Sequence, residues 1–249
     1  SRVLRARIWV AQVGRVPLLL LDSDIPENDH DMRNVTDRLY GGDQEHRIKQ
    51  ELLAGIGGVR AIRAYTAIEG RPNPDVFHMN EGHAGFLGLE RVREYMQTDH
   101  LDFDTALAIV RASTLFTTHT PVPAGIDRFP LDMVERYFGG DADDGLLPGV
   151  GVERVLGFGA EPDPSKFNMA HMGLRLAQRS NGVSQLHGRV SREMFNDLWP
   201  GFDPAEVPIG SITNGVHGPT WAAPEWMDLG LDRRLSERRV DDQTMWDGI

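Results

Sequence analysis

The sequence predicts an α/β protein with a mainly parallel sheet and flanking helices. Short apolar or β-branched runs, such as residues 16–21, alternate along the chain with segments whose apolar residues repeat every three or four positions. A continuous apolar run is typical of a strand buried on both faces, as parallel strands usually are. Polar clusters also follow expected strand ends, which is where open α/β sheets bind ligands.

Composition limits the possible classes of protein. The 249 residues suffice for one large domain or two small ones, and the net charge of −11 has no basic stripe to offset it. Nucleic acid is therefore not an expected partner. There is no run of about 18 apolar residues, so we expect no transmembrane helix and no membrane partner. The absence of cysteine excludes disulfides and thiolate sites and fits a cytoplasmic protein.

The first half of the chain contains strongly patterned segments. Residues 8–13 are a candidate partner strand for 16–21, and Asp43 is placed to cap a helix over 44–63. Gly55, Gly57 and Gly58 predict close backbone packing in that helix, or an early end near Ile56. Further on, the pattern predicts strands at 76–80 and 113–118 and helices at 84–96 and 104–111, the second capped by Asp102 or Asp104.

The second half is predicted with the same signals. A helix over 131–138 is followed by a longer one over 164–180, with Ser165 as its cap and Asn181-Gly182 as its stop. A short strand at 183–186, a helix at 191–198 and a strand at 209–213 follow. From residue 222 the chain is charged and expected to be mostly helical, with Trp226 and Trp246 in it.

Two polar clusters are the candidates for chemistry. His78, Asn80, Glu81 and His83 occupy six residues where a strand passes into a helix, and His119 stands where a second strand meets a loop fixed by prolines. Two such clusters at the strand ends of one sheet suggest one site. Their neutral donors and acceptors suit sugar hydroxyl groups.

A metal site is the alternative for the first cluster. His78, Glu81 and His83, with His119, could hold zinc in a metal-dependent hydrolase. The spacing is not H-E-x-x-H, and His78 and His83 lie on either side of the turn from strand to helix. This interpretation is therefore the weaker one.

Five motifs together resemble one enzyme family. They are R-L-Y-G-G-D-Q-E-H-R-I-K-Q-E at 38–51, H-M-N-E-G-H-A-G-F at 78–86, F-T-T-H-T-P-V-P-A-G at 116–125, N-G-V-S-Q-L-H-G at 181–188 and I-T-N-G-V-H at 212–217. In this order they resemble the α-glucan (glycogen/maltodextrin) phosphorylases, and the N-E-G-H string is similar to that of bacterial members. The resemblance covers nearly the whole chain.

The resemblance implies a fold and a reaction. The family has two Rossmann-like domains in the GT-B glycosyltransferase architecture, with the active site between them. Its members carry out retaining phosphorolysis of terminal α-1,4-linked glucose to glucose 1-phosphate, which serves glycogen degradation. The implied partners are the α-1,4-glucan (glycogen or maltodextrin) and inorganic phosphate, and a homodimer is left open. Residues 1–221 match part of the N-terminal Rossmann-like domain, and 222–249 match the link toward the C-terminal domain.

The same resemblance implies a cofactor. Family members hold pyridoxal phosphate on a lysine of the second domain. Lys49 and Lys166 are the only lysines here, and neither resembles that lysine. A Schiff base needs a lysine amine, so we expect a fragment that binds no pyridoxal phosphate and has no turnover of its own. A non-catalytic α-glucan-binding module is the alternative function.

Seven residues match positions to which the family assigns roles. His119 resembles the histidine that contacts the sugar 6-hydroxyl and whose backbone carbonyl faces the developing oxocarbenium charge. Asn214 resembles an asparagine that reaches the same hydroxyl. The other five match the glucan entrance (Asp43 and Arg47) or the lining beside the glucosyl site (Glu81, His83 and Thr120).

Overall fold

The computed structural model describes residues 3–39, 41–139 and 146–223 of the chain. Backbone contacts divide the chain into two units, Ser1–Thr213 and Asn214–Ile249. The first unit carries all the strands found in the described residues, and the described part of the second contains one short helix, α10 (Gly218–Trp221).

Part of the expected tail lies outside the described residues, including Trp226 and Trp246. The domain boundary at residue 221, and the link formed by 222–249, therefore stay predictions. Within the described ranges, no helix combines the length and the apolar character needed to cross a bilayer.

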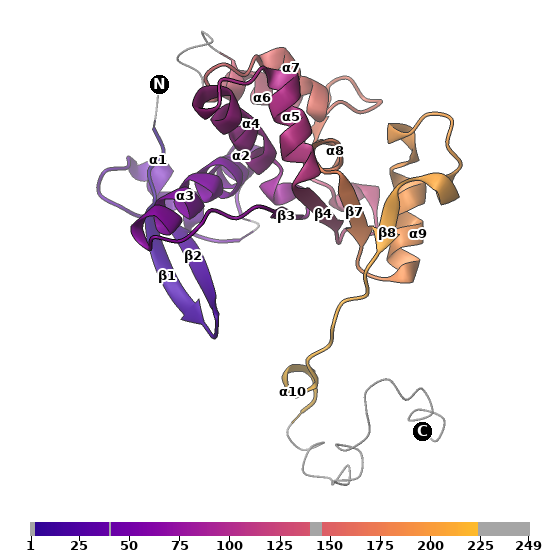
Figure 1. Cartoon of the computed structure of the whole chain (residues 1–249), viewed down its shortest axis with the longest axis horizontal. Helices are drawn as coiled ribbons and strands as arrows, with labels where there is room; N and C mark the ends of the chain where they lie inside the picture. The colour runs from indigo at the N-terminus through magenta and orange to yellow at the C-terminus, as the bar shows by residue number, and fades with distance from the viewer. Residues whose placement is uncertain (1–2, 40, 140–145, 224–249) are drawn as a thin grey trace. The chain divides into compact units, whose positions relative to one another are not determined.

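A four-stranded parallel sheet forms the centre of the first unit (Figure 1). Its strands lie in the order β3 (Phe77–Asn80), β4 (Thr114–Thr118), β7 (Arg179–Gly182) and β8 (Ile209–Ser211). Neighbouring strands are parallel throughout, so each connection has to return to the starting end of the sheet, and helices make these crossings. The predicted α/β class, with a parallel sheet and flanking helices, is confirmed.

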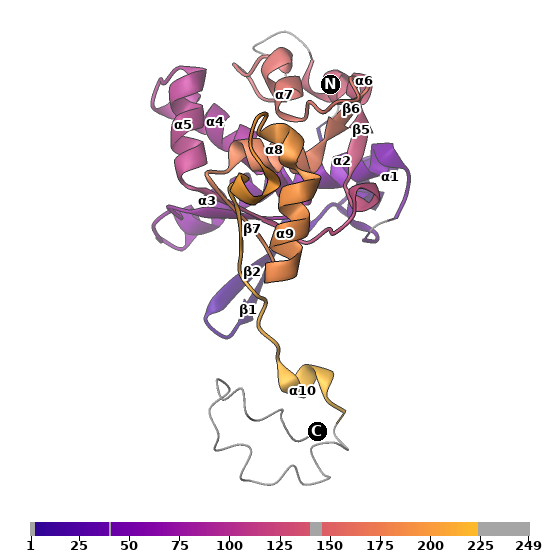
Figure 2. The same ribbon diagram turned by 90° about the vertical axis from the view of Figure 1, so that its right-hand side faces the viewer.

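Helices pack along this sheet in two groups. Figure 1 shows α4 (Phe86–Thr98), α5 (Phe103–Ala112) and α8 (Met169–Leu176) on the same side of the strands. Helix α9 (Gln185–Met194) connects β7 to β8 and contacts both (Figure 2). Asp102 caps α5 by accepting the N–H of Thr105 at 3.0 Å, as one of the two predicted caps.

The two faces of the sheet differ sharply. Phe77, Met79 and Phe116 are buried in the main apolar core, whereas His78 and Asn80 are exposed on the opposite face of β3. This follows the period of two that places successive side chains on opposite sides of a strand. The polar residues of the H-M-N string are therefore excluded from the core.

The remaining elements are short and surround the sheet. Strands β5 (Arg128–Pro130) and β6 (Lys166–Asn168) form an antiparallel pair. Helix α6 spans Leu131–Phe138, as predicted. The others are α1 (His30–Arg33), α7 (Val152–Phe158) and the short turns η1 (Asn34–Thr36), η3 (Gly82–Ala84), η4 (Pro123–Gly125), η5 (Asn196–Leu198) and η6 (Pro204–Glu206).

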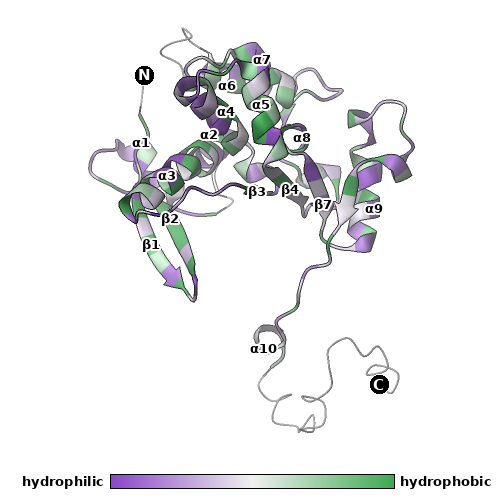
Figure 3. Cartoon of the chain, viewed as in Figure 1, coloured by the Kyte–Doolittle hydropathy of each residue, from purple (hydrophilic) through white to green (hydrophobic). Residues whose placement is uncertain are grey.

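The apolar run near the N-terminus forms a hairpin instead of a buried parallel strand. β1 (Arg7–Val13) and β2 (Val16–Asp22) pair antiparallel around a two-residue turn with Gly14 at φ +58°. The prediction of a partner strand is confirmed, but the prediction of burial on both faces is wrong, because Leu18 and Leu20 of β2 are about half exposed. Figure 3 shows apolar residues along both strands.

The long helix after Asp43 is continuous but changes pitch. Asp43 caps α2 (Gln44–Leu52), as predicted, by accepting the N–H of His46 at 2.9 Å. A π-helical segment, η2 (Leu53–Gly57), leads into α3 (Gly58–Ile68). A Cβ at Gly55 would lie 2.8 Å from the backbone nitrogen of Leu87. Of the two predicted meanings of the glycines, close packing is therefore correct and an early end is wrong.

Two alanine substitutions in this helix should have opposite effects on stability. Gly55→Ala should lower the free energy of unfolding by about 1–3 kcal/mol, because backbone atoms of α4 block the new methyl group. Gly58→Ala should raise it by up to about 1 kcal/mol, because that position is helical and has nothing within 4 Å. Urea unfolding of the chain measures both, and equal destabilisation by the two would contradict the packing argument.

The predicted helix over 164–180 is wrong in its extent. Only Met169–Leu176 is helical, and β6 and β7 lie on either side of it. Asn168 is the cap, accepting the N–H of His171 at 3.0 Å, whereas Ser165 donates to Asp163 in a turn. Both strands are too short to show a period, and they exist because β5 and β4 pair with them.

The structure also corrects the predictions for the residues that follow the helix expected over 164–180. Asn181 lies inside β7 instead of ending a helix, and the chain leaves the sheet where a strand at 183–186 was expected. Helix α9 begins at Gln185, six residues before the predicted helix, because Ser184 caps it by accepting the N–H of His187 at 3.0 Å. The predicted strand at 209–213 is confirmed in β8, which is shorter.

Candidate active site

The candidate site lies where β3 and β4 end. The parallel register places Asn80 beside Thr117, and the backbone N–H of Glu81 donates to the Thr117 carbonyl at 2.8 Å. The residues that follow each strand, Glu81 and His119, are therefore neighbours although they are 38 positions apart. The sequence prediction that the two polar clusters meet at one edge of the sheet agrees with this geometry.

The carboxylate of Glu81 binds the backbone that follows β4. Its Oε2 accepts the N–H of His119 at 2.6 Å and that of Thr120 at 2.9 Å, together with the Thr120 hydroxyl at 3.0 Å. Glu81 is 8% exposed, so these bonds replace the hydration that the carboxylate has lost. The residue also has φ 72° and ψ 177°, a region used almost only by glycine, which costs about 1–3 kcal/mol.

The His119 side chain is held at the surface. Its Nε2 lies 2.6 Å from Oδ1 of Asn80 on the neighbouring strand, and its ring is exposed. His78 is bonded elsewhere, with Nε2 2.7 Å from the Thr117 hydroxyl on the exposed face of the sheet. An oriented and accessible imidazole suits hydrogen bonding to a polar ligand.

A second cluster gathers around Asp127, in the loop before β5. Oδ2 of Asp127 accepts from Nη2 of Arg47 at 2.8 Å and lies 3.0 Å from Nδ1 of His83. Arg47 also lies 3.3 Å from Oε1 of Glu51, four residues later in α2. Three elements therefore meet in one network of two acids, an arginine and a histidine, which we call the Asp127 cluster.

The pKa values in this cluster follow from burial and charge. Burial raises the pKa of Glu51 to about 7, because its side chain is only 2% exposed. Among the described residues, Oε2 of Glu51 has no hydrogen-bond partner. The hydrogen bond to Asp127, with the nearby Glu51, raises the pKa of His83 to about 9. Burial alone would raise the pKa of Asp127, but the hydrogen bond from His83 and the charge of Arg47 outweigh it and lower this pKa to about 2.

The proposed zinc set is not brought together. In the described ranges, the group with ligand atoms within 4.8 Å of one another is Glu51, His83 and Asp127, which shares only His83 with that set. Arg47 already occupies the same carboxylates, and the raised pKa of His83 favours its cationic form. This arrangement fits an ion-pair network better than metal ligation.

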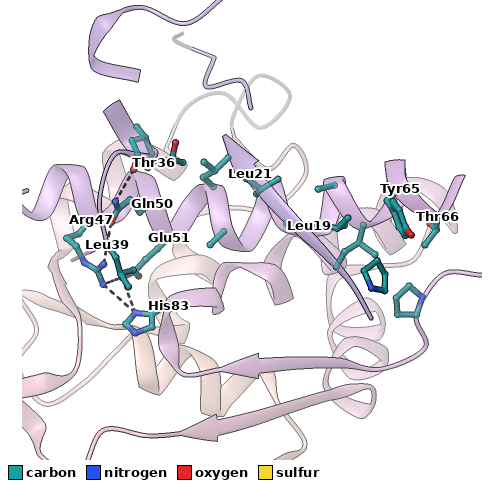
Figure 4. A pocket seen from close by; sticks show the side chains of 18 of the residues that line it. Leu19, Leu21, Thr36, Leu39, Arg47, Gln50, Glu51, Tyr65, Thr66 and His83 are labelled. Atoms are coloured by element: carbon teal, nitrogen blue, oxygen red, sulfur yellow. Dashed lines mark hydrogen bonds and ion pairs between the residues drawn. The ribbon is translucent and has the colours of Figure 1, made fainter. Parts of the chain in front are cut away.

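A pocket of about 880 Å³ opens beside the Asp127 cluster (Figure 4). Figure 4 shows Arg47, Glu51 and His83 together on one side of it, with Tyr65 and Thr66 on the other. Strand β2, the segment η2 and helix α3 contribute most of its apolar lining, whereas α2 contributes the polar side chains of Arg47, Gln50 and Glu51. The apolar residues include Leu19, Leu21, Val35, Leu39, Leu53, Ala54, Ala61 and Ile62.

The structure thus separates the predicted site residues into groups. Glu81, His119 and Thr120 are in direct contact, while Arg47 and His83 belong to the Asp127 cluster. Asp43 is an exposed helix cap one turn before Arg47. Asn214 belongs to the second unit.

Sequence reasoning missed Glu51 and Asp127 as partners. The spacing of Arg47 and Glu51, four apart in an amphipathic helix, was a signal for the first. Asp127 gave no local signal, because its contact with Arg47 spans 80 residues.

Comparisons with known proteins agree with the motifs. The chain is 77% identical over 235 residues to a glycogen phosphorylase of Mycobacterium tuberculosis, covering 93% of this chain and 27% of that protein. It is 40% identical over 252 residues to a maltodextrin phosphorylase of Thermococcus litoralis, covering all of this chain and 29% of the relative. A glycogen phosphorylase of Aquifex aeolicus is 35% identical over 247 residues, which cover 97% of this chain and 34% of that protein. No protein-family model matches the chain.

The chain therefore spans about a third or less of the length of these relatives. Its parallel sheet with flanking helices is the Rossmann-like arrangement that the resemblance to the GT-B architecture implied. Sequence identity over nearly the whole chain and the agreement in fold lead to one assignment. The chain belongs, as a segment of the bacterial type, to the glycogen and maltodextrin phosphorylase family.

Proposed function

We propose that the chain is the sugar-binding part of the active cleft of an α-1,4-glucan phosphorylase. The observation that carries this is the 77% identity over 93% of the chain to the M. tuberculosis glycogen phosphorylase. The geometry supports it, because His119 and Thr120 are fixed at the strand ends while the His119 imidazole stays accessible. The reaction is retaining phosphorolysis of a terminal α-1,4-linked glucose to glucose 1-phosphate.

Each candidate residue has a proposed role. His119 binds the sugar 6-hydroxyl, and its backbone carbonyl faces the positive charge that develops on the sugar ring. A dipole already oriented toward that charge stabilises the transition state without reorganisation. Asn214 binds the same hydroxyl. Asp43 and Arg47 lie at the glucan entrance, and the lining beside the glucosyl site contains Glu81, His83 and Thr120.

The residues of this segment do not fit pyridoxal phosphate, although the family uses it. Lys49 lies within α2 and Lys166 begins β6, and neither lines the pocket beside the Asp127 cluster, so no lysine amine there could form the Schiff base. We therefore propose that the cofactor is held elsewhere in a longer enzyme. The proposed partners are α-1,4-glucan and inorganic phosphate, in a cytoplasmic enzyme for which a homodimer is an option.

Exchange of the segment tests the proposed function. The 235 matching residues of the M. tuberculosis enzyme are replaced by those of this chain, which gives the segment-exchanged phosphorylase. We expect glucose 1-phosphate release from maltodextrin within about tenfold of the parent, a difference of about 1.4 kcal/mol in the barrier. A folded, cofactor-loaded exchange enzyme with no activity would contradict the proposal. The chain alone should show no imine absorbance with pyridoxal phosphate.

A non-catalytic α-glucan-binding module remains the alternative. It predicts measurable maltodextrin affinity for the chain alone by calorimetry. It also predicts that the segment-exchanged phosphorylase releases no glucose 1-phosphate. The metal-dependent hydrolase using His78, Glu81 and His83 has less support, because the structure holds these residues in separate networks.

A further inference from the structure

Glu81 has a backbone conformation that its residue type does not favour. Its φ of 72° with ψ of 177° lies in a region that is essentially restricted to glycine. In the described residues, His100 is the one other non-glycine residue with positive φ. A glycine would adopt this turn without strain, so the side chain of Glu81 must supply something that offsets it.

That side chain bonds to the backbone of the neighbouring strand end. The buried carboxylate accepts the N–H groups of both His119 and Thr120, and the Thr120 hydroxyl as well. The backbone N–H of Glu81 adds a bond to the Thr117 carbonyl. Because these bonds involve a charged acceptor, they are stronger than ordinary backbone hydrogen bonds. They connect the end of β3 rigidly to the first two residues after β4.

The bond to Thr120 determines where the His119 carbonyl points. The N–H of Thr120 and the carbonyl of His119 belong to one peptide group, and the structure has no cis peptide bond in the described residues. In a planar trans peptide the N–H and C=O point in opposite directions. Since the Thr120 N–H points at Glu81, the His119 carbonyl points away from Glu81.

We propose that Glu81 is a positioning residue, whose carboxylate holds the His119–Thr120 peptide so that the His119 carbonyl keeps a fixed direction. This rests on the proposed function, in which that carbonyl faces the charge developing on the glucosyl ring. It differs from the expectation that Glu81 lines the sugar pocket, because Glu81 acts on the substrate through His119. An error of about 1 Å in a catalytic group can reduce the rate about a hundredfold.

Three substitutions in the segment-exchanged phosphorylase test the role. Glu81→Gly removes the carboxylate and also the backbone strain, so the exchange enzyme should keep its Tm while kcat falls by about tenfold to a hundredfold. Glu81→Gln keeps the shape of the side chain but loses its charge, so its kcat should lie between that of Glu81→Gly and that of the unsubstituted exchange enzyme. Glu81→Asp keeps the charge on a shorter side chain and should recover part of the kcat lost in Gly. KM for maltodextrin should change by less than about threefold in all three.

The outcomes separate this role from others. Glu94→Gln is the matched control, because Glu94 on α4 pairs with Arg63 on α3 at 2.9 Å, away from the strand ends. This substitution should leave kcat unchanged. A raised KM with unchanged kcat would mean that Glu81 binds the glucan directly, and unchanged kinetics would also overturn the proposal. If kcat fell only in proportion to Tm across the three variants, Glu81 would stabilise the fold without positioning the His119 carbonyl. An inactive exchange enzyme without any substitution would refute the proposed function itself, and this inference with it.

Discussion

Replacing His119 with alanine should lower kcat of the segment-exchanged phosphorylase by about 10²- to 10³-fold. The imidazole is held 2.6 Å from Asn80, so it can bind the sugar hydroxyl without losing much freedom. The variant keeps the bond from the Thr120 N–H to Glu81, and with it the direction of the carbonyl of residue 119. KM for maltodextrin should change by less than about threefold, because the lost bond matters most in the transition state.

A second histidine provides the control for this measurement. His100 is exposed after helix α4 and has φ 55°, which asparagine tolerates well. His100→Asn should therefore leave both kcat and KM unchanged. If His119→Ala retained full kcat, the imidazole of His119 would have no part in the reaction. If it raised KM alone, His119 would bind the glucan equally in the ground and transition states.

The sequence predicted those elements whose signals are local. Helices α4, α5 and α6 were placed within about two residues, because an apolar stripe or a capping aspartate such as Asp102 defines them without help from elsewhere. Strands β6 and β7 were missed because each has only three or four residues and depends on a distant partner. The hairpin strand β2 was misjudged because burial is decided by the surrounding structure, which composition alone does not reveal.

The candidate site was predictable to a similar extent. The motifs predict that Glu81, His119 and Thr120 belong to one site, and the parallel register of β3 and β4 explains why they are in contact. The sequence does not predict which of these residues would bind the sugar and which would position the others. The backbone conformation of Glu81 and the direction of its carboxylate depend on contacts with the end of β4. The position of Asp127 in its cluster could not be predicted for the same reason, because its contacts with His83 and Arg47 join residues 44 and 80 positions apart.

Replacing Asp127 with asparagine should lower the free energy of unfolding of the chain by about 2 kcal/mol at neutral pH, as its lowered pKa implies. Asparagine has nearly the same shape, so the loss reports the charge. Without that charge, Arg47 and His83 remain close together, with the largely buried Glu51 as their acidic neighbour. Asp104→Asn is the control, because its bond to Arg154 is exposed and should contribute less than about 1 kcal/mol.

The pH dependence of this loss identifies its source. The pKa of Asp127 is lowered to about 2, so its contribution is complete above its ordinary pKa of 3.8 and disappears as the pH falls through about 2. The pKa of His83 is raised from 6.5 to about 9, so its contribution is complete below pH 6.5 and is lost as the pH rises through about 9. Urea unfolding should therefore show the largest gap between parent and Asp127→Asn at about pH 5.5 and a smaller one at about pH 10. A gap of equal size at both values would mean that His83 contributes nothing and that Arg47 alone stabilises the charge of Asp127.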